Sequence, residues 1–128
     1  MTNAQARAFA AEWIENFNRL GLEAVLSHFA ADAEFTSPRA MAVVGKPTVH
    51  SRQELSDYWH AAVKSIRSLH FTLDHVINDE SAGRVVIVYI SEVDGKKVRA
   101  AEFFEFNDAQ QVIRGEAMHG AAVASLET

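Results

Sequence analysis

The chain has 128 residues, 48% of them apolar and 23% charged, which fits one soluble globular domain spanning residues 1–128. It contains no cysteine, which excludes disulfides and thiolate metal sites, and its formal net charge of −5 disfavours nucleic acid as a partner. No apolar run approaches the roughly 18 residues that span a bilayer and no leader segment is visible, so we expect a cytoplasmic protein without a membrane partner.

The N-terminal residues predict two helices. Gln5 follows Thr2 by three positions, as in a capping box, and an apolar stripe with helical spacing comes next, formed by Ala6, Phe9, Ala10, Trp13, Phe17 and Leu20. Gly21 interrupts this stripe. A short second helix is then expected to direct inward Leu22, Val25, Leu26 and Phe29.

A short strand, a loop and a third helix are expected next. The strand covers residues 33–36 and ends at Ser37-Pro38, because the residue before a proline is driven towards extended geometry. Residues 39–50 lack a clear period, which predicts a loop that is a candidate cover for a pocket. Ser51 and Glu54 have capping-box spacing, and a helical stripe follows them as far as Leu69.

From His70 onward the apolar residues recur with a period of two, which is typical of strands. The predicted strands cover residues 70–77, 85–93, 98–106 and 112–123, and Asp94-Gly95 is a strong signal for a two-residue hairpin turn. Helices first and hairpin-linked strands afterwards indicate an α+β fold. We therefore expect three helices laid across a curved antiparallel sheet, giving a cone-shaped domain with an apolar pocket between the layers.

Glu102 is the most informative position for function. Alternate side chains share one face of a strand, and those that share the face of Glu102 are all apolar: Val98, Ala100, Phe104 and Phe106. A carboxyl group in such a row is desolvated, which raises its pKa and makes it a candidate acid, base or hydrogen-bond donor facing a pocket. The alternative is a structural carboxyl group that is hydrogen-bonded to a buried Trp, Tyr or His.

Trp13 and His119 are further candidates. Trp13 lies in the middle of the first helical stripe, where an aromatic residue usually belongs to the core, and its indole N–H needs a partner when buried. His119, on the last predicted strand, carries the one side chain that ordinarily titrates near neutral pH. No histidines and carboxylates have metal-ligand spacing, and no phosphate-binding glycine loop or dinucleotide motif is present, so we expect no metal and no cofactor.

Several segments taken in order resemble the NTF2-like superfamily, which includes ketosteroid isomerases and SnoaL-type polyketide cyclases. The first helix contains Trp13-Ile14-Glu15, and residues 28–38 read His-Phe-Ala-Ala-Asp-Ala-Glu-Phe-Thr-Ser-Pro. The third-helix segment begins at residues 51–55, and the last hairpin contains residues 101–106 and 112–114. The resemblance covers nearly the whole chain and implies a cystatin-like roll, a cone in which three helices pack on a curved sheet.

The resemblance also implies roles for individual residues. Ser37 stands where the isomerases have their aspartate base, so steroid isomerisation by the familiar mechanism is not expected. Trp13 stands where the isomerases have the tyrosine that donates a hydrogen bond to the oxyanion. Glu102 corresponds to the carboxylic acid that apolar surroundings keep protonated in the isomerases. Trp59 matches the aromatic residue of the third helix, and His119 falls among the pocket residues of the last strand.

These considerations favour a SnoaL-like protein that binds a small apolar organic ligand and, as an enzyme, carries out a cofactor-free isomerisation or cyclisation by proton transfer. Glu102 and His119 are the candidate catalytic residues, and the expected ligand-binding residues are Trp13, Phe17, Ser37, Tyr58, Trp59, Phe104 and Met118. The alternative is a non-catalytic ligand-binding or assembly module. The resemblance also implies a homodimer formed through the exposed face of the sheet.

Overall fold

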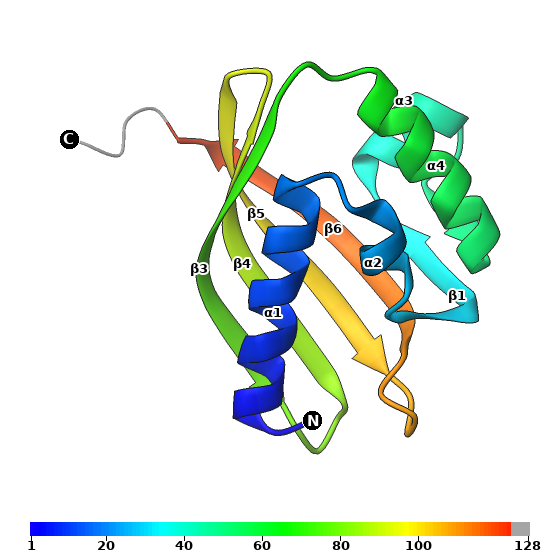
Figure 1. The fold of residues 1–128 in the computed structure, drawn as a ribbon, viewed down its shortest axis with the longest axis vertical. Helices are drawn as coiled ribbons and strands as arrows, with labels where there is room; N and C mark the ends of the chain where they lie inside the picture. Colours follow the sequence, from blue (N-terminus) through cyan, green and yellow to red (C-terminus); the bar gives the residue numbers. More distant parts are fainter. Residues whose placement is uncertain (124–128) are drawn as a thin grey trace.

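Residues 1–123, which a computed structural model describes, form four helices and six strands (Figure 1). In chain order the elements are α1 (Asn3–Asn18), α2 (Leu22–Leu26), β1 (Phe29–Thr36), α3 (Pro38–Val44), β2 (Thr48–His50), α4 (Arg52–Lys64), β3 (Leu69–Asp79), β4 (Arg84–Val93), β5 (Lys96–Phe106) and β6 (Val112–Ala122). The predicted α+β class, with helices packed on a curved sheet, is confirmed.

The six strands form one mixed sheet in the order β2-β1-β6-β5-β4-β3. Strands β3 to β6 follow one another as antiparallel neighbours, and the hairpin at Asp94-Gly95 has positive φ at both turn residues, 51° and 82°, as this kind of turn requires. Strand β1 joins the sheet from the other side and pairs parallel with β6. The expectation of an antiparallel sheet therefore holds for every neighbouring pair in the described chain except this one.

The segment predicted as a loop, residues 39–50, instead contains helix α3 and the short strand β2. The Ser37 hydroxyl accepts a hydrogen bond from the backbone N–H of Arg39, Pro38 occupies the first helical turn, and Gly45 ends the helix in the left-handed conformation at φ 80°. These are ordinary start and stop signals for a helix. Residues 1–123 therefore form four helices where three were expected.

The two predicted capping boxes differ in outcome. The first is confirmed, because the Gln5 backbone N–H donates to the Thr2 hydroxyl and the Thr2 backbone N–H donates to the Gln5 side chain. In the second, the Ser51 hydroxyl accepts from the Glu54 backbone N–H, but the Glu54 carboxylate accepts from the backbone N–H of His50. Only the first half of that motif is formed.

Helices α1 and α2 lie across the inner face of the sheet, and the apolar core fills the space between the layers (Figure 1). Trp13 is 1% exposed, and its ring packs at 4.7 Å between centroids against Phe104 of β5. The side chain of Phe35 on β1 packs closely over Gly115 of the neighbouring strand β6, where an added Cβ would lie 2.9 Å from a ring carbon of Phe35. None of the helices among residues 1–123 has the length and apolar character that a membrane crossing requires.

Candidate functional site

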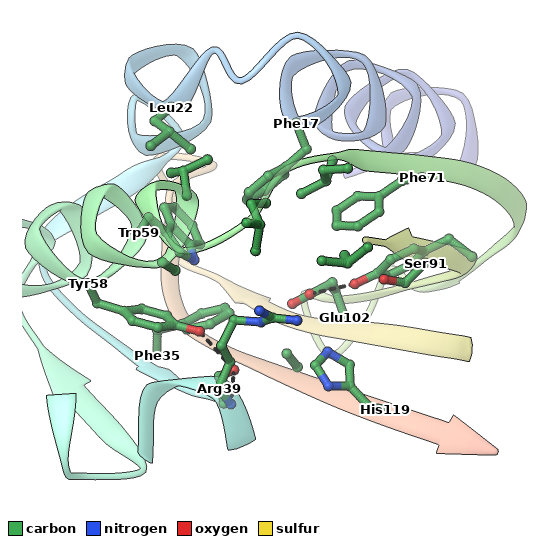
Figure 2. A pocket seen from close by; sticks show the side chains of 18 residues that line it. Phe17, Leu22, Phe35, Arg39, Tyr58, Trp59, Phe71, Ser91, Glu102 and His119 are labelled. Atoms are coloured by element: carbon green, nitrogen blue, oxygen red, sulfur yellow. Dashed lines mark hydrogen bonds between the residues drawn. The ribbon is translucent and has the colours of Figure 1, made fainter. Parts of the chain in front are cut away.

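A pocket lies between the inner face of the sheet and helices α3 and α4 (Figure 2). The last turn of α1 contributes Phe17 to its wall. Its volume is about 80 Å³. A single water needs about 10–15 Å³, so this space suits a compact group of about six heavy atoms, about the size of one ring. Its wall is mostly apolar and is made by Phe17, Leu22, Phe35, Trp59, Ala62, Val63, Ile66, Leu69, Phe71, Val93 and Ala117.

Glu102 lies in the middle of β5 and faces this pocket. It is 6% exposed, and the neighbours that share its face, Ala100 and Phe104, are also buried, so the burial expected from the alternation is confirmed. The Tyr89 hydroxyl donates a 2.9 Å hydrogen bond to Oε1 of Glu102, while the buried Oε2 has no partner among the described residues. The alternative role, a structural carboxyl group bonded to a buried tyrosine, thus accounts for Oε1 of Glu102 but not for Oε2.

Burial raises the pKa of Glu102 from 4.5 to about 8, and the hydrogen bond from Tyr89 lowers it by a smaller amount. At pH 7 the carboxyl group is therefore mainly protonated. Burial also raises the pKa of Tyr89 well above its ordinary value, so the tyrosine remains a donor. Since Oε1 accepts from Tyr89, the proton of Glu102 belongs on Oε2, which leaves an O–H group free to donate to a ligand.

His119 lies on β6 and lines the same pocket. Ala117 is the register partner of Glu102, so His119, two residues further along, is a diagonal neighbour of Glu102 on the inner face of the sheet. The residue as a whole is exposed, but its ring is partly enclosed where it lines the pocket. This enclosure lowers the pKa of His119 below 6.5, and the nearby charge of Arg39 lowers it further. The imidazole is therefore neutral at pH 7 and can accept a proton.

Ser37 and Tyr58 form a hydroxyl pair on the opposite side of the pocket. Their oxygens are 3.1 Å apart, and Ser37 is 3% exposed. Burial raises the pKa of Tyr58, so its hydroxyl stays protonated. Glu102 is the one carboxylic acid among the described residues that line the pocket. Ser37, at the position where the resemblance places the aspartate base, has a hydroxyl group that caps helix α3.

Arg39 also lines the pocket, and it was not among the predicted site residues. Figure 2 shows its guanidinium group reaching into the space between Tyr58 and Glu102. The sequence did contain a signal for the helix that carries it, since Ser37-Pro38 and Gly45 mark the two ends of α3. The direction of the arginine side chain depends on how α3 packs beside the sheet, and no local pattern encodes that.

Four predicted ligand-binding residues, Phe17, Ser37, Tyr58 and Trp59, do line the pocket. Three others are not among its lining residues: Trp13 and Phe104 pack against each other deeper in the core, and Met118 is 45% exposed on the outer face of β6. Only the last turn of α1 reaches the pocket, which is why Phe17 lines it and Trp13, one turn earlier, does not. Met118 faces away because neighbouring residues of a strand alternate.

The pocket thus combines a protonated acid, Glu102, with a neutral base, His119, in neighbouring strands. Environments that move the pKa values of two groups in opposite senses are a common basis for acid–base chemistry. Within residues 1–123 no three histidine or acidic side chains come together in a way that could hold a metal ion. The arrangement can donate a hydrogen bond to one ligand atom and accept a proton from another.

Comparisons with known proteins agree with this architecture. Residues 10–114 match the family model described as a SnoaL-like domain. No curated protein matches the chain.

Solved structures with the same fold span nearly all of the chain. A SnoaL-like protein of unknown function from Burkholderia thailandensis E264 has 29% sequence identity and a TM-score of 0.83, covering 94% of this chain and 98% of that one. An NTF2-like protein of unknown function from Burkholderia pseudomallei K96243 has 22% identity and a TM-score of 0.76, covering 93% and 92%. TerC, co-crystallised with polyporic acid, has 17% identity and a TM-score of 0.73, covering 89% and 90%.

Proposed function

This chain belongs to the SnoaL-like domain family, and from that premise we propose that its pocket binds a small, largely apolar organic molecule and moves a proton on it without a cofactor. The observation that carries the proposal is the carboxyl group of Glu102, which is buried, protonated at neutral pH and without a partner at Oε2 among residues 1–123. The fold relative TerC was co-crystallised with polyporic acid, which supports an organic ligand in a cone of this kind.

The reaction we propose begins at a carbon next to a carbonyl group. The neutral imidazole of His119 removes a proton from that carbon, and the electron pair of the broken C–H bond moves towards the carbonyl oxygen. The enolate oxygen that results accepts a hydrogen bond from Oε2 of Glu102. A donor placed where negative charge develops stabilises the transition state more than the ground state.

Two outcomes are open to this enolate. In an isomerisation, the imidazolium of His119 returns its proton to a different carbon of the same molecule. In an aldol-type cyclisation, the enolate carbon attacks a second carbonyl of the ligand, and Glu102 gives its proton to the oxygen of that carbonyl as the new carbon–carbon bond forms. The proton that His119 holds then returns to Glu102 through solvent, which restores both groups. Both reactions balance without an oxidant, a reductant or a metal.

Exchange of C–H hydrogens with solvent deuterium tests the proposal directly. We expect the protein to accelerate deuterium uptake by 2-cyclohexen-1-one in D₂O, followed by proton NMR. Positioned acid–base groups contribute about 10²–10⁴-fold, so Glu102→Gln and His119→Phe are each expected to lose about 10²-fold or more of that acceleration. Glu116→Gln, an exposed glutamate on β6, is the matched control and is expected to behave as the parent. Unchanged exchange in Glu102→Gln would rule out its catalytic role.

A second function, a non-catalytic ligand-binding module, is favoured by one observation. Ser37 is capped into α3 and paired with Tyr58, so this side of the pocket offers no carboxylate base. The two functions separate in a thermal-shift screen followed by NMR of the recovered ligands. Ligands that raise the melting temperature but come back without deuterium or rearrangement identify a binding module.

We also propose a homodimer formed through the outer face of the sheet. Phe103 is 39% exposed and Met118 is 45% exposed, and both lie on the outer face of neighbouring strands, on a surface that also carries charged side chains such as Glu116. Light scattering is expected to give twice the chain mass of 14.1 kDa. A monomer mass that persists at high concentration would exclude the dimer.

A further inference from the structure

Arg39 is a partly buried arginine whose guanidinium group has neither a hydrogen bond nor a salt bridge within residues 1–123. Within residues 1–123, five of the other seven arginines have an acceptor for the side chain, and the two that have none, Arg7 and Arg67, are exposed. Arg52 donates to the carbonyl of Phe29, Arg19 donates to Asn16, and Arg114 pairs with the carboxylate of Glu105. Arg39 instead directs its donors into the pocket (Figure 2).

The groups around Arg39 do not supply the missing acceptor. None of them is hydrogen-bonded to the guanidinium group and none is negatively charged at pH 7, because Tyr58 and Tyr89 stay protonated and the carboxyl group of Glu102 is neutral. His119, which also lines the pocket, is neutral as well. A guanidinium group keeps its charge at every physiological pH and carries five N–H donors, so partial burial without an acceptor is unfavourable. The guanidinium nitrogens are not among the fully buried atoms that lack a partner, so water can reach them, and a ligand anion in the pocket would replace that water.

We propose that the pocket prefers small ring-containing carboxylates to neutral ligands of the same shape, with the carboxylate bound by Arg39 and the ring packed against the aromatic wall that includes Trp59 and Phe71. A guanidinium fork matches a planar carboxylate through two parallel hydrogen bonds, which is why this pairing is favoured over a single-atom anion. The volume of about 80 Å³ suits one ring. This inference rests on the proposed function in that the same pocket is used.

The placement also suggests how such a ligand would be oriented. Figure 2 shows the side chains of Arg39 and Glu102 facing one another across the pocket. A carboxylate held by Arg39 therefore brings the adjoining ligand atoms towards Oε2 of Glu102. Arg39 would act as a specificity residue that selects and orients the ligand, while the proton transfer stays with Glu102 and His119.

The test compares two probes of nearly identical shape, benzoate and benzamide, by titration of ¹⁵N-labelled protein followed in two-dimensional NMR at pH 6.5. We expect benzoate to shift the amide signals of pocket residues and to bind at least about tenfold more tightly than benzamide, since charge-assisted bonds are about twice as strong as neutral ones. Arg39→Met keeps the aliphatic stem and is expected to abolish this preference. Arg7→Met, an exposed position on α1, removes the same charge away from the pocket and should leave the preference unchanged.

Three results would overturn the inference. These are equal affinity for benzoate and benzamide in the parent protein, an unchanged preference in Arg39→Met, and no pocket shifts with benzoate, cyclohexanecarboxylate or phenylacetate. The first and third need no variant, so a folding defect in Arg39→Met would not obscure them. Failure here is separate from failure of the proposed function, because deuterium exchange is measured on a neutral ketone that offers Arg39 no carboxylate.

Discussion

Replacing Glu102 with glutamine should make the protein more stable at neutral and alkaline pH, although it removes the proposed acid. The folded-state pKa of this group is about 8, whereas its ordinary value is 4.5. Between these two values the unfolded chain has released the proton and the folded chain still holds it. The folded state then binds more protons than the unfolded state, so the free energy of unfolding falls as the pH rises.

The size of the effect follows from the same two values. Below pH 4.5 both states are protonated and the stabilising contribution is complete, and above pH 8 the loss is complete. At about 1.4 kcal/mol per pH unit, the loss is about 3 kcal/mol at pH 7, about 4 kcal/mol at pH 8 and about 5 kcal/mol once it is complete. Glutamine has nearly the same shape, keeps an oxygen that can accept from Tyr89 and does not ionise, so the variant escapes this loss.

Urea unfolding of parent and Glu102→Gln at intervals from pH 4 to pH 9 measures the difference. Other groups titrate in both proteins and cancel, so the difference in unfolding free energy should rise through this window in favour of the variant. With urea slopes of about 1–3 kcal/mol per molar, the midpoints at pH 7 should differ by on the order of 1–3 M. Glu116→Gln should show no such trend. A flat difference for Glu102→Gln would mean that the carboxyl group is ionised normally, and the reasoning about the pocket would be refuted.

Three further predictions concern the surroundings of this group. Tyr89→Phe should raise the pKa of Glu102 above about 8, because it removes a hydrogen bond that lowers this pKa. Carbon-13 NMR titration of the carboxyl group measures the change, and an unchanged pKa would contradict the prediction. Arg39→Met should raise the pKa of His119, since the arginine charge lowers it; an unaltered titration of the imidazole protons would place the guanidinium too far away. Gly115→Ala should destabilise the fold by about 1–3 kcal/mol in urea unfolding, because its Cβ would lie 2.9 Å from a ring carbon of Phe35. An unchanged free energy of unfolding would show that the ring can move aside.

The sequence allowed the prediction of Glu102 because the relevant pattern is local. Alternation along β5 places a carboxyl group in an apolar row whatever the rest of the fold does, and its burial is confirmed. The helical stripe around Trp13 is equally local, but it predicts only that the residue is buried. Whether a buried aromatic side chain lines a cavity or fills the core depends on where the helix ends relative to the sheet. For α1, that boundary falls between Trp13 and Phe17.

The role of Arg39 and the parallel pairing of β1 with β6 could not be predicted for a different reason. Both depend on a contact between segments that lie far apart in the chain, and nothing near Phe35 specifies that it pairs with Gly115. Helix α3 itself could have been predicted, because Ser37-Pro38 is a strong signal for the start of a helix as well as for the end of a strand. An interpretation of this dipeptide as a strand end alone misses the element that carries the arginine.

The electrostatic character of the pocket connects the proton transfer with the choice of ligand. The chain carries a net charge of −5, yet no lining residue among those described carries a negative charge at pH 7, since Glu102 is neutral, and Arg39 adds a positive charge. The desolvation that keeps Glu102 neutral also disfavours a negative charge on a ligand, so a bound carboxylate depends on the charge of Arg39 and an enolate oxygen depends on the hydrogen bond from Glu102. Once Glu102 ionises above about pH 8, its own charge opposes both, so ligand binding and proton transfer should decline together at alkaline pH.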